Sequence, residues 1–208
     1  MSKKVYIVGG GGLAREIITW NNRPSSSLLD IVGCFDDNLN VWADYEIEHI
    51  PILGTTTEIG EYDNFIMGIM NVDIKERLFV EFKAQNKSFV SYFDRDSIVG
   101  DRSISGEGIT LMPGTIISCD VRIGKLVTIN IGTKIGHDSV VGNFCSLMSD
   151  VNLGGNVALG DKVFIGTGAV ILPGVKIAPG IRVGAGSVVI RSLKEPGTYF
   201  GNPAKKIF

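Results

Sequence analysis

The sequence predicts two structural units in one chain: a small α/β unit with a parallel sheet, and then a solenoid of short parallel strands. Three observations support this prediction. Apolar runs alternate with helical patterns in the first ninety or so residues, four consecutive glycines follow the first run, and the remainder repeats an aliphatic residue every six positions. Strands that alternate with helices favour a parallel sheet, whereas a short fixed period favours a solenoid.

The N-terminal unit begins with a strand, a glycine turn and a helix. Residues 5–8 form an apolar run, glycines occupy 9–12, and a helical pattern extends from 13 to about 22. A second apolar run at 31–35 stops at Asp36 and Asp37, which indicates the end of a strand and a turn. This order is typical of a β-α-β unit.

A third strand and a second helix complete the predicted unit. The strand is expected at 64–69, and Asn71 can cap the helix that follows it. Ile74, Leu78 and Phe82 are spaced four residues apart, which places them on one helical face. The resulting unit of about ninety residues is large enough to pack independently.

Beyond Ile98 the aliphatic residues recur every six positions. A small or β-branched residue stands two positions before each of them, and glycine follows directly in seven of fourteen hexads. We interpret each hexad as one short strand with two inward side chains and a turn at which glycine is sterically free. The spacing between Ile104 and Leu111 is seven, which predicts a one-residue bulge or a small loop there. The aliphatic positions are Leu111, Ile117, Ile123, Ile129, Ile135, Val141, Leu147, Leu153, Leu159, Ile165, Ile171, Ile177, Val183 and Val189.

Composition excludes several classes of protein. The 208 residues include 20 Lys+Arg and 22 Asp+Glu, and 44% are hydrophobic, so neither a disordered chain nor a basic nucleic-acid binder is expected. No apolar run approaches the roughly 18 residues of a membrane span, and none resembles a signal peptide. Cys34, Cys119 and Cys145 are widely spaced and odd in number, which favours a reducing, cytoplasmic location over disulfides or structural zinc.

The glycine turn suggests a phosphate site. Residues 9–14 match G-x-G-x-x-A between a strand and a helix, as in a Rossmann-like βαβ unit, where backbone N–H groups bind phosphate oxygens. Asp36 and Asp37 follow the next strand, where a dinucleotide enzyme places its ribose carboxylate, so NAD binding is an alternative. Ninety residues supply only half of a dinucleotide-binding sheet, which argues against it.

The hexads at 135–140 and 159–164 resemble those of the hexapeptide-repeat acyltransferases. The segment 199–205 is similar to the G-N-P-A-K tail of those enzymes. With its N-terminal unit, the chain resembles bacterial sugar acetyltransferases that act on nucleotide-linked 4-amino sugars or on sialic acid in glycan biosynthesis, such as that of O-antigen. This resemblance implies a left-handed parallel β-helix with three hexads per coil, acetyl-CoA as co-substrate, no metal, and a homotrimer with active sites between subunits. The expected domains are a nucleotide-sugar-binding domain at 1–93, the β-helix at 94–195 and a C-terminal cap segment at 196–208.

The resemblance also assigns catalytic roles. His137 matches the general base, Asp138 the carboxylate that orients it, and Gly155 the N–H donor to the tetrahedral oxyanion. An imidazole suits the transfer of a proton from a sugar amine that attacks a thioester, because its ordinary pKa is near neutrality. The chain has one other histidine, His49, so it lacks the three histidine ligands of the zinc-dependent β-helix enzymes.

Two further groups of residues match binding positions of these enzymes. The related enzymes often have histidine or another residue at the position of Leu13 and glycine at that of Met70, so these two departures leave the identity of the nucleotide and the sugar open. The positions expected to contact coenzyme A are Ser146, Gly155, Thr167, Ala185 and Lys205. The positions expected to contact the nucleotide-linked sugar are Gly9, Gly10, Gly11, Gly12, Leu13, Asp36, Asp37, Met70, Asn71, Arg77 and Asn130.

Three functions follow as hypotheses. The first is N-acetylation of a nucleotide-linked 4-amino-4,6-dideoxy sugar by direct attack on acetyl-CoA. The second is O-acetylation of sialic acid or a related glycan hydroxyl with the same histidine. The third is a purely structural solenoid, which would bind no acetyl-CoA.

Overall fold

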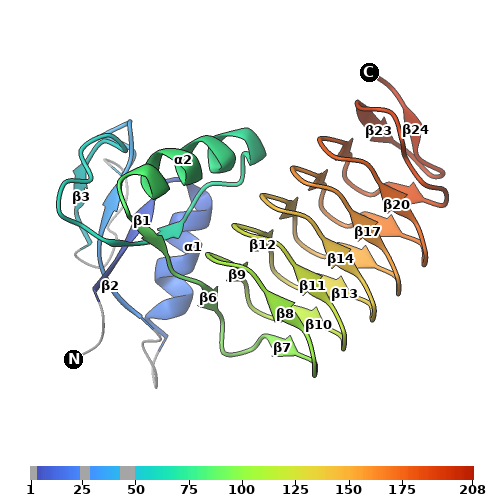
Figure 1. Ribbon diagram of the computed structural model, residues 1–208, viewed down its shortest axis with the longest axis horizontal. Coiled ribbons are helices and arrows are strands. Elements are labelled where there is room, and N and C mark those ends of the chain that lie inside the picture. The colour runs from blue at the N-terminus through green and yellow to red at the C-terminus, as the bar shows by residue number, and fades with distance from the viewer. Residues whose placement is uncertain (1–3, 24–28, 43–49) are drawn as a thin grey trace.

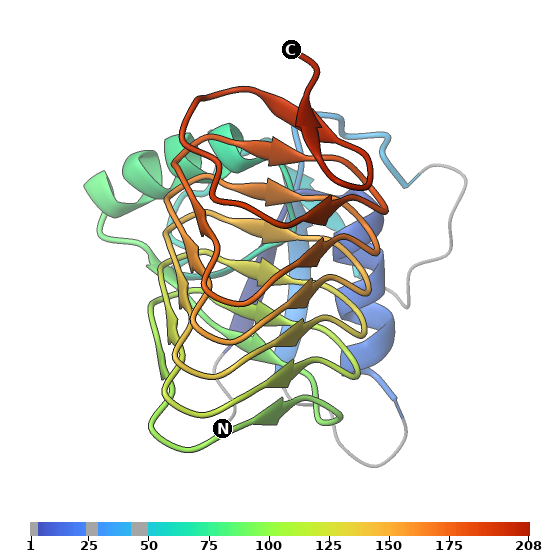
Figure 2. The ribbon, with the colours of Figure 1, turned by 90° about the vertical axis from the view of Figure 1, so that its right-hand side faces the viewer.

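The computed structural model describes residues 4–23, 29–42 and 50–208, and His49 lies outside these ranges. A small α/β unit lies beside the N-terminal end of a parallel solenoid (Figure 1). Figure 2 shows the coils stacked on one another up to the C-terminal strands. No helix within the described ranges is long and apolar enough to cross a membrane.

The sheet of the N-terminal unit is entirely parallel, with the strand order β3-β2-β1-β4-β5. Its strands are β1 (Lys4–Val8), β2 (Asp30–Phe35), β3 (Ile52–Gly54), β4 (Asn64–Met67) and β5 (Ser88–Phe89). The three strands expected from the sequence are confirmed as β1, β2 and β4. The sequence did not predict β3 and β5, because runs of three and two residues show no periodicity.

The two helices, α1 (Gly12–Asn21) and α2 (Val72–Ala84), bury side chains against different faces of this sheet. Ile17 and Ile18 of α1 belong to the cluster that contains Val5 and Ile7, whereas α2 packs in the cluster that contains Val8. Successive side chains of a strand point to opposite faces, so the helices sandwich the sheet. The predicted cap of α2 is confirmed, because the Asn71 side chain accepts hydrogen bonds from the N–H groups of Asp73 and Ile74.

The solenoid strands form three sheets, and up to the last coil each strand pairs in parallel with the strand eighteen residues later. At the C-terminal end, Arg182 pairs with Thr198, sixteen residues later, and the final strand is antiparallel. The first sheet contains β7 (Ile98–Val99), β10 (Ile116–Ile117), β13 (Lys134–Ile135), β16 (Asn152–Leu153), β19 (Val170–Ile171) and β22 (Val188–Val189). The second contains β8 (Ile104–Ser105), β11 (Arg122–Ile123), β14 (Val140–Val141), β17 (Ala158–Leu159) and β20 (Lys176–Ile177). The third contains β6 (Tyr92–Phe93), β9 (Thr110–Leu111), β12 (Thr128–Ile129), β15 (Ser146–Leu147), β18 (Phe164–Ile165), β21 (Arg182–Val183), β23 (Thr198–Phe200) and β24 (Lys205–Lys206). Three hexads therefore make one coil.

The two inward positions of each hexad form the solenoid core. All fourteen aliphatic residues predicted from the sequence are buried, as are the small or β-branched residues that precede them by two positions. Each such aliphatic side chain contributes about 1.5–3 kcal/mol through burial before chain entropy is subtracted. The repeat thus builds one continuous core along the whole solenoid.

The predicted bulge or small loop after Ile104 is wrong. The strand pairing is unbroken there, because Ile104 pairs with Arg122 and Ser105 pairs with Ile123. Ser105 occupies the position held by an aliphatic residue in later coils, and Ile104 is 66% exposed. The solenoid also begins one hexad before Ile98, with β6 as the first strand of its third sheet.

The glycines after the aliphatic positions have a different physical reason from the one expected. A Cβ atom on Gly136 would lie 2.5 Å from the nitrogen of Gly155 in the next coil, and φ is not left-handed at Gly136. The left-handed backbone falls two residues later, where Asp138 has a φ of 58°. Glycine is therefore required at position 136 by the close approach of coils rather than by the turn itself.

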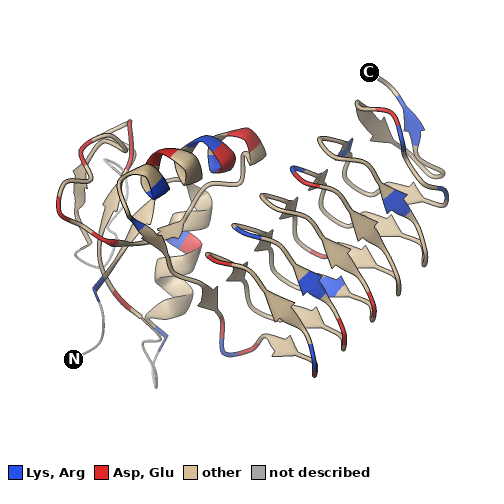
Figure 3. Ribbon diagram, viewed as in Figure 1, with Lys and Arg blue, Asp and Glu red and all other residues tan. Residues whose placement is uncertain are grey.

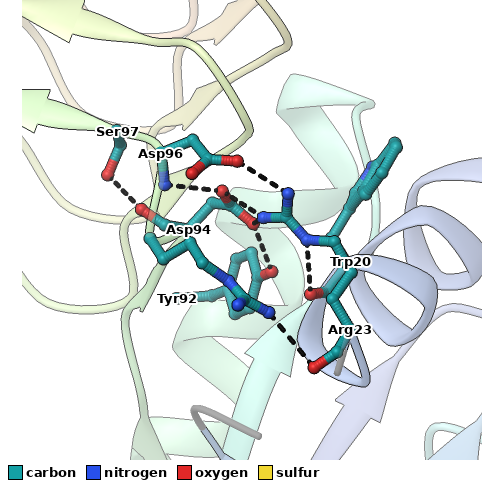
Figure 4. A network of polar contacts seen from close by, with 7 residues as sticks. Trp20, Arg23, Tyr92, Asp94, Asp96 and Ser97 are labelled. Carbon is teal, nitrogen blue, oxygen red and sulfur yellow. Dashed lines mark hydrogen bonds and ion pairs between the residues drawn. The ribbon is translucent and has the colours of Figure 1, made fainter. Parts of the chain in front are cut away.

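A polar network joins the end of α1 to the first coil (Figure 4). Arg23 donates to the buried carboxylate of Asp94 at 2.7 Å and to Asp96 at 2.6 Å. The Tyr92 hydroxyl donates to the same Asp94 carboxylate at 3.1 Å, and burial raises the pKa of this tyrosine. Because its charged groups are mutually paired, this network fixes the α/β unit to the start of the solenoid.

Candidate active site

His137 and Gly155 occupy the same corner of the solenoid in successive coils. His137 follows β13 and Gly136, and Gly155 follows β16 and Gly154, eighteen residues later. The His137 side chain is 63% exposed, and its Nδ1 lies 2.7 Å from Oδ2 of the equally exposed Asp138. A carboxylate accepts hydrogen bonds only, so in the neutral ring Nδ1 is the donor and Nε2 has the free lone pair.

The second ring nitrogen of His137 lies over Gly155. A Cβ atom built on Gly155 would be 2.7 Å from His137 Nε2 and 2.8 Å from Cε1. Only a residue without a side chain leaves the imidazole in this position. The corner thus presents an imidazole nitrogen directly beside a backbone glycine.

The N–H group of Gly155 is available at this corner. At a neighbouring corner, each such N–H group donates to a side chain one coil further on. The N–H of Lys125 donates to the Asn143 side chain, and the N–H of Asn143 donates to the Asp161 side chain. The residue one coil beyond Gly155 is Pro173, whose ring has no acceptor. Within the described part of the chain, the Gly155 N–H donates to no protein acceptor. It can therefore donate to a negative oxygen of a ligand.

A second carboxylate lies one coil before Asp138. Asp120 accepts two hydrogen bonds from Arg102, at 2.7 and 2.6 Å. The Arg102 guanidinium, with a smaller contribution from His137, holds the pKa of the Asp120 carboxyl below its usual range. This pairing offsets the charge of Asp120 beside the histidine.

The glycine turn is held by one of the two aspartates that follow β2. Asp36 accepts from the N–H of Gly10 at 2.6 Å, so its carboxylate binds the turn itself. Asp37 accepts from the N–H and hydroxyl of Thr56, and these hydrogen bonds lower its pKa. A Cβ atom on Gly11 or Gly12 would meet no atom within 4 Å, so this part of the turn is open.

The other positions expected to contact the sugar have varied environments. Leu13 is buried in the core of the α/β unit, and Met70 is partly buried against the same core. Arg77 is exposed and forms an ion pair with Glu81 at 3.1 Å. Asn130 is buried, and its side-chain oxygen accepts from the N–H of Ile131 at 2.7 Å.

The positions expected to contact coenzyme A do not share one corner. Thr167 and Ala185 are exposed and lie one above the other at the corner after β18 and β21, whereas Gly155 belongs to the corner after β16. Lys205 is exposed in β24. Ser146 is fully buried, and its hydroxyl donates to the carbonyl of Met70 at 2.7 Å. This burial places Ser146 beneath the α/β unit rather than on a surface that a coenzyme could reach.

Sequence reasoning missed Lys75, a fully buried lysine of α2 that contacts the solenoid. Its neighbours Ile74 and Leu78 indicated one apolar helical face, but a sequence does not show that a second structural unit covers an adjacent face. Among the described residues, no group of three or more His, Cys, Asp or Glu side chains is arranged to hold a metal ion.

Comparison with known proteins identifies similar sugar acyltransferases, although no family model matches the chain. PerB from Caulobacter crescentus, solved in complex with CoA and GDP-perosamine, is 29% identical with a TM-score of 0.88, over 99% of this chain and 98% of that chain. WeeI from Acinetobacter baumannii AYE is 25% identical with a TM-score of 0.86, over 99% of this chain and 100% of that chain.

The curated relatives match a shorter region. Acyl-[acyl-carrier-protein]–UDP-N-acetylglucosamine O-acyltransferase from Pseudomonas paraeruginosa is 28% identical over 109 residues, which are 52% of this chain and 42% of that protein. The chain thus spans less than half the length of the curated relatives it matches. Together, these comparisons confirm the resemblance to hexapeptide-repeat sugar acyltransferases.

Proposed function

We propose that this chain is an acetyl-CoA-dependent N-acetyltransferase that acts on the amine of a nucleotide-linked 4-amino-4,6-dideoxy sugar. The observation behind the proposal is the position of His137 Nε2 over Gly155, whose N–H group has no acceptor among the residues that the structure describes. Asp138 supports it, because its carboxylate lies 2.7 Å from Nδ1 and orients the ring. The substrate classes are inferred from PerB, which was solved with CoA and GDP-perosamine.

The proposed reaction is a direct attack on the thioester. The sugar nitrogen forms a bond to the acetyl carbonyl carbon while His137 Nε2 takes a proton from that nitrogen. The resulting oxyanion accepts a hydrogen bond from the Gly155 N–H. When the tetrahedral intermediate collapses, the carbon–sulfur bond breaks and the protonated His137 returns the proton to the coenzyme A sulfur.

The nucleotide-linked sugar is assigned to the domain at 1–93. The helix α1 begins at Gly12, and its N-cap residue Gly11 has no side chain to cap the first N–H groups. Such an open helix N-terminus favours a phosphate. We assign the nucleoside diphosphate to the turn at Gly9–Gly12. We also propose that the parallel sheet of this domain belongs to a Rossmann-like unit.

The coenzyme is assigned to a groove of a homotrimer. Gly155 and the pair Thr167 and Ala185 lie at different corners of one chain, so a single subunit does not bring these positions together. When three solenoids pack side by side, the corner of one subunit meets a different corner of its neighbour. We propose this arrangement for a left-handed β-helix at 94–195 capped by 196–208, in a cytoplasmic enzyme.

O-acetylation is the second candidate, because the curated relatives are O-acyltransferases. The same imidazole can also serve as the general base for a hydroxyl acceptor. The two candidates differ in the acceptor molecule and in the atom that receives the acetyl group, a sugar nitrogen or a hydroxyl oxygen.

Acceptor screening by mass spectrometry distinguishes these candidates. The purified chain is incubated with acetyl-CoA and either UDP-, dTDP- or GDP-linked 4-amino-4,6-dideoxy sugars or sialic acid. We expect one of the amino sugars to gain an acetyl group in place of hydrogen, and its 4-hydroxy analogue to remain unchanged. Acetylation of sialic acid or of the hydroxy analogue alone would overturn the N-acetyltransferase assignment.

A further inference from the structure

Lys75 is a buried lysine at the contact between the α/β unit and the solenoid. Its side chain is completely shielded from solvent. Figure 3 marks several other charged residues along α2, and most of these are exposed. Lysine is almost never fully buried unless its ammonium group is paired. Here the partners are the solenoid strands β12 and β15, so the charged group of one unit is enclosed by the other.

Three acceptors of the solenoid surround the Lys75 amine. Nζ donates to the Thr128 hydroxyl at 2.8 Å, to the Cys145 carbonyl at 3.0 Å and to the Ser146 hydroxyl at 2.7 Å. An ammonium group has three donors, so these contacts satisfy the protonated form completely. None of the three acceptors carries a negative charge.

The other charged groups of this contact are paired elsewhere. Asp73 and Glu76 of α2 face Lys162 of the solenoid, at 3.7 and 2.9 Å. The titratable group that faces the Lys75 amine is the Cys145 thiol, whose pKa burial raises to about 12, so it stays neutral. Lys75 is thus a buried cation without a counter-ion in the described part of the chain.

Packing alone does not require a lysine here. A buried ionic group is often replaced by an apolar side chain of similar volume without loss of stability. The Cys145 carbonyl and the Ser146 hydroxyl each have a second partner, the Thr128 N–H and the Met70 carbonyl respectively. The lysine therefore defines the geometry of the contact between α2 and the solenoid rather than adding to the stability of the fold.

The hydrogen bonds of Lys75 lead to the loop between β4 and α2. Ser146 accepts from Lys75 and donates to the carbonyl of Met70, and Asn71 follows directly as the cap of α2. This loop lies beside the glycine turn, since the N–H of Gly68 donates to Val8 and a Cβ atom on Gly9 would meet Ile69. The amine of Lys75 is therefore one hydroxyl group away from the loop assigned to the acceptor.

We propose that Lys75 is a positioning residue: through Ser146 it holds the Met70–Asn71 loop against the solenoid, and thereby sets where the nucleotide-linked acceptor lies relative to the catalytic corner. This inference rests on the proposed function for its substrate, but the hydrogen bonds that fix the loop do not depend on that function.

Loss of a proton from the Lys75 amine changes these hydrogen bonds. A neutral amine has two donors and one lone pair, so one contact must reverse, which the Thr128 hydroxyl permits and the Cys145 carbonyl does not.

Hydrogen exchange tests directly whether Lys75 fixes the Met70–Asn71 loop. In Lys75→Met, we expect amides in the segment 68–74 to exchange at least about threefold faster than in the wild type, with exchange in the solenoid beyond residue 150 unchanged. The matched control is Lys162→Met, which removes a partly exposed ion pair between the solenoid and the same helix and is expected to change little. If Lys75→Met does not fold, Thr128→Val removes one acceptor only and is used in its place. Equal exchange in the folded variant and the wild type would overturn the proposal.

The pH dependence of stability provides a second readout. Burial lowers the pKa of Lys75 from 10.5 to about 7. The folded pKa is thus below the unfolded pKa, so the cost of burying the charge is fully present below about pH 7 and is relieved as the pH rises towards 10.5. We expect Lys75→Met to raise Tm most at pH 6 and least at pH 9. A Tm difference that is constant across this range would contradict a buried titrating amine.

Kinetics separate this inference from the proposed function. In the folded Lys75→Met variant we expect KM for the acceptor to rise about tenfold, as for one lost positioning contact, while KM for acetyl-CoA stays constant. If both KM values are unchanged, Lys75 does not position the acceptor. If the wild type acetylates no nucleotide-linked amino sugar, the proposed function fails, and the exchange experiment still decides whether Lys75 holds the loop.

Discussion

Replacement of His137 by alanine is expected to lower kcat by about a hundredfold to ten-thousandfold, the usual contribution of a general base. The fold should survive, because the imidazole is 63% exposed and lies outside the solenoid core. The measurement is the rate of coenzyme A thiol release at saturating acetyl-CoA and acceptor, together with Tm. We expect an unchanged Tm beside the loss of turnover.

Asp138→Asn is the matched comparison for this variant. It preserves shape but removes the carboxylate charge 2.7 Å from Nδ1, so the ring loses its charged orienting partner. We expect a smaller loss of kcat than in His137→Ala. A His137→Ala variant with near-wild-type turnover and an unchanged Tm would remove the histidine from the mechanism.

Substitution of Gly155 should lower activity through the position of the histidine ring. In Gly155→Ala the new methyl group would lie 2.7 Å from His137 Nε2, so the ring must move away. A misplacement of about 1 Å costs about a hundredfold in rate, and we expect a loss of kcat of this size. Stability should change little, because the displaced atoms belong to an exposed side chain. Steady-state kinetics and Tm measure both effects.

Two further variants identify the cause. In a His137→Ala background, Gly155→Ala meets no ring and should cause little additional loss of turnover. Gly155→Pro also removes the N–H group, and proline already occupies the same corner one coil later, at Pro173. We expect Gly155→Pro to be at least about tenfold slower than Gly155→Ala, as for a lost oxyanion donor. Equal rates for these two variants would exclude the N–H group as that donor.

The solenoid was predictable because each hexad repeats the same physical constraint. The burial of the fourteen aliphatic residues between Leu111 and Val189 follows from their six-residue spacing alone. The prediction of a bulge or small loop after Ile104 was wrong because hydrophobicity and register disagree there: Ser105, and not the more hydrophobic Ile104, has the inward position. The strands β3 and β5 were not predicted, because they are defined by pairing to neighbours rather than by their own sequence.

The candidate site was predictable only in part. The eighteen-residue spacing places His137 and Gly155 at one corner, and the structure agrees. Small size alone did not distinguish Ser146, which lies beneath the α/β unit, from Ala185, which is exposed. The role proposed for Lys75 depends on contacts between two units, and such contacts have no signature in a single sequence.

Acceptor-dependent release of coenzyme A thiol by the wild-type chain is the most direct test of the catalytic corner. The chain is mixed with acetyl-CoA and each nucleotide-linked 4-amino sugar in turn, with His137→Ala measured beside it at the same concentration. The account predicts thiol release that requires the acceptor, equals the amount of N-acetylated sugar, and falls at least about a hundredfold in the variant. Equal release by the variant, or no release by the wild type with any of these sugars, would contradict it.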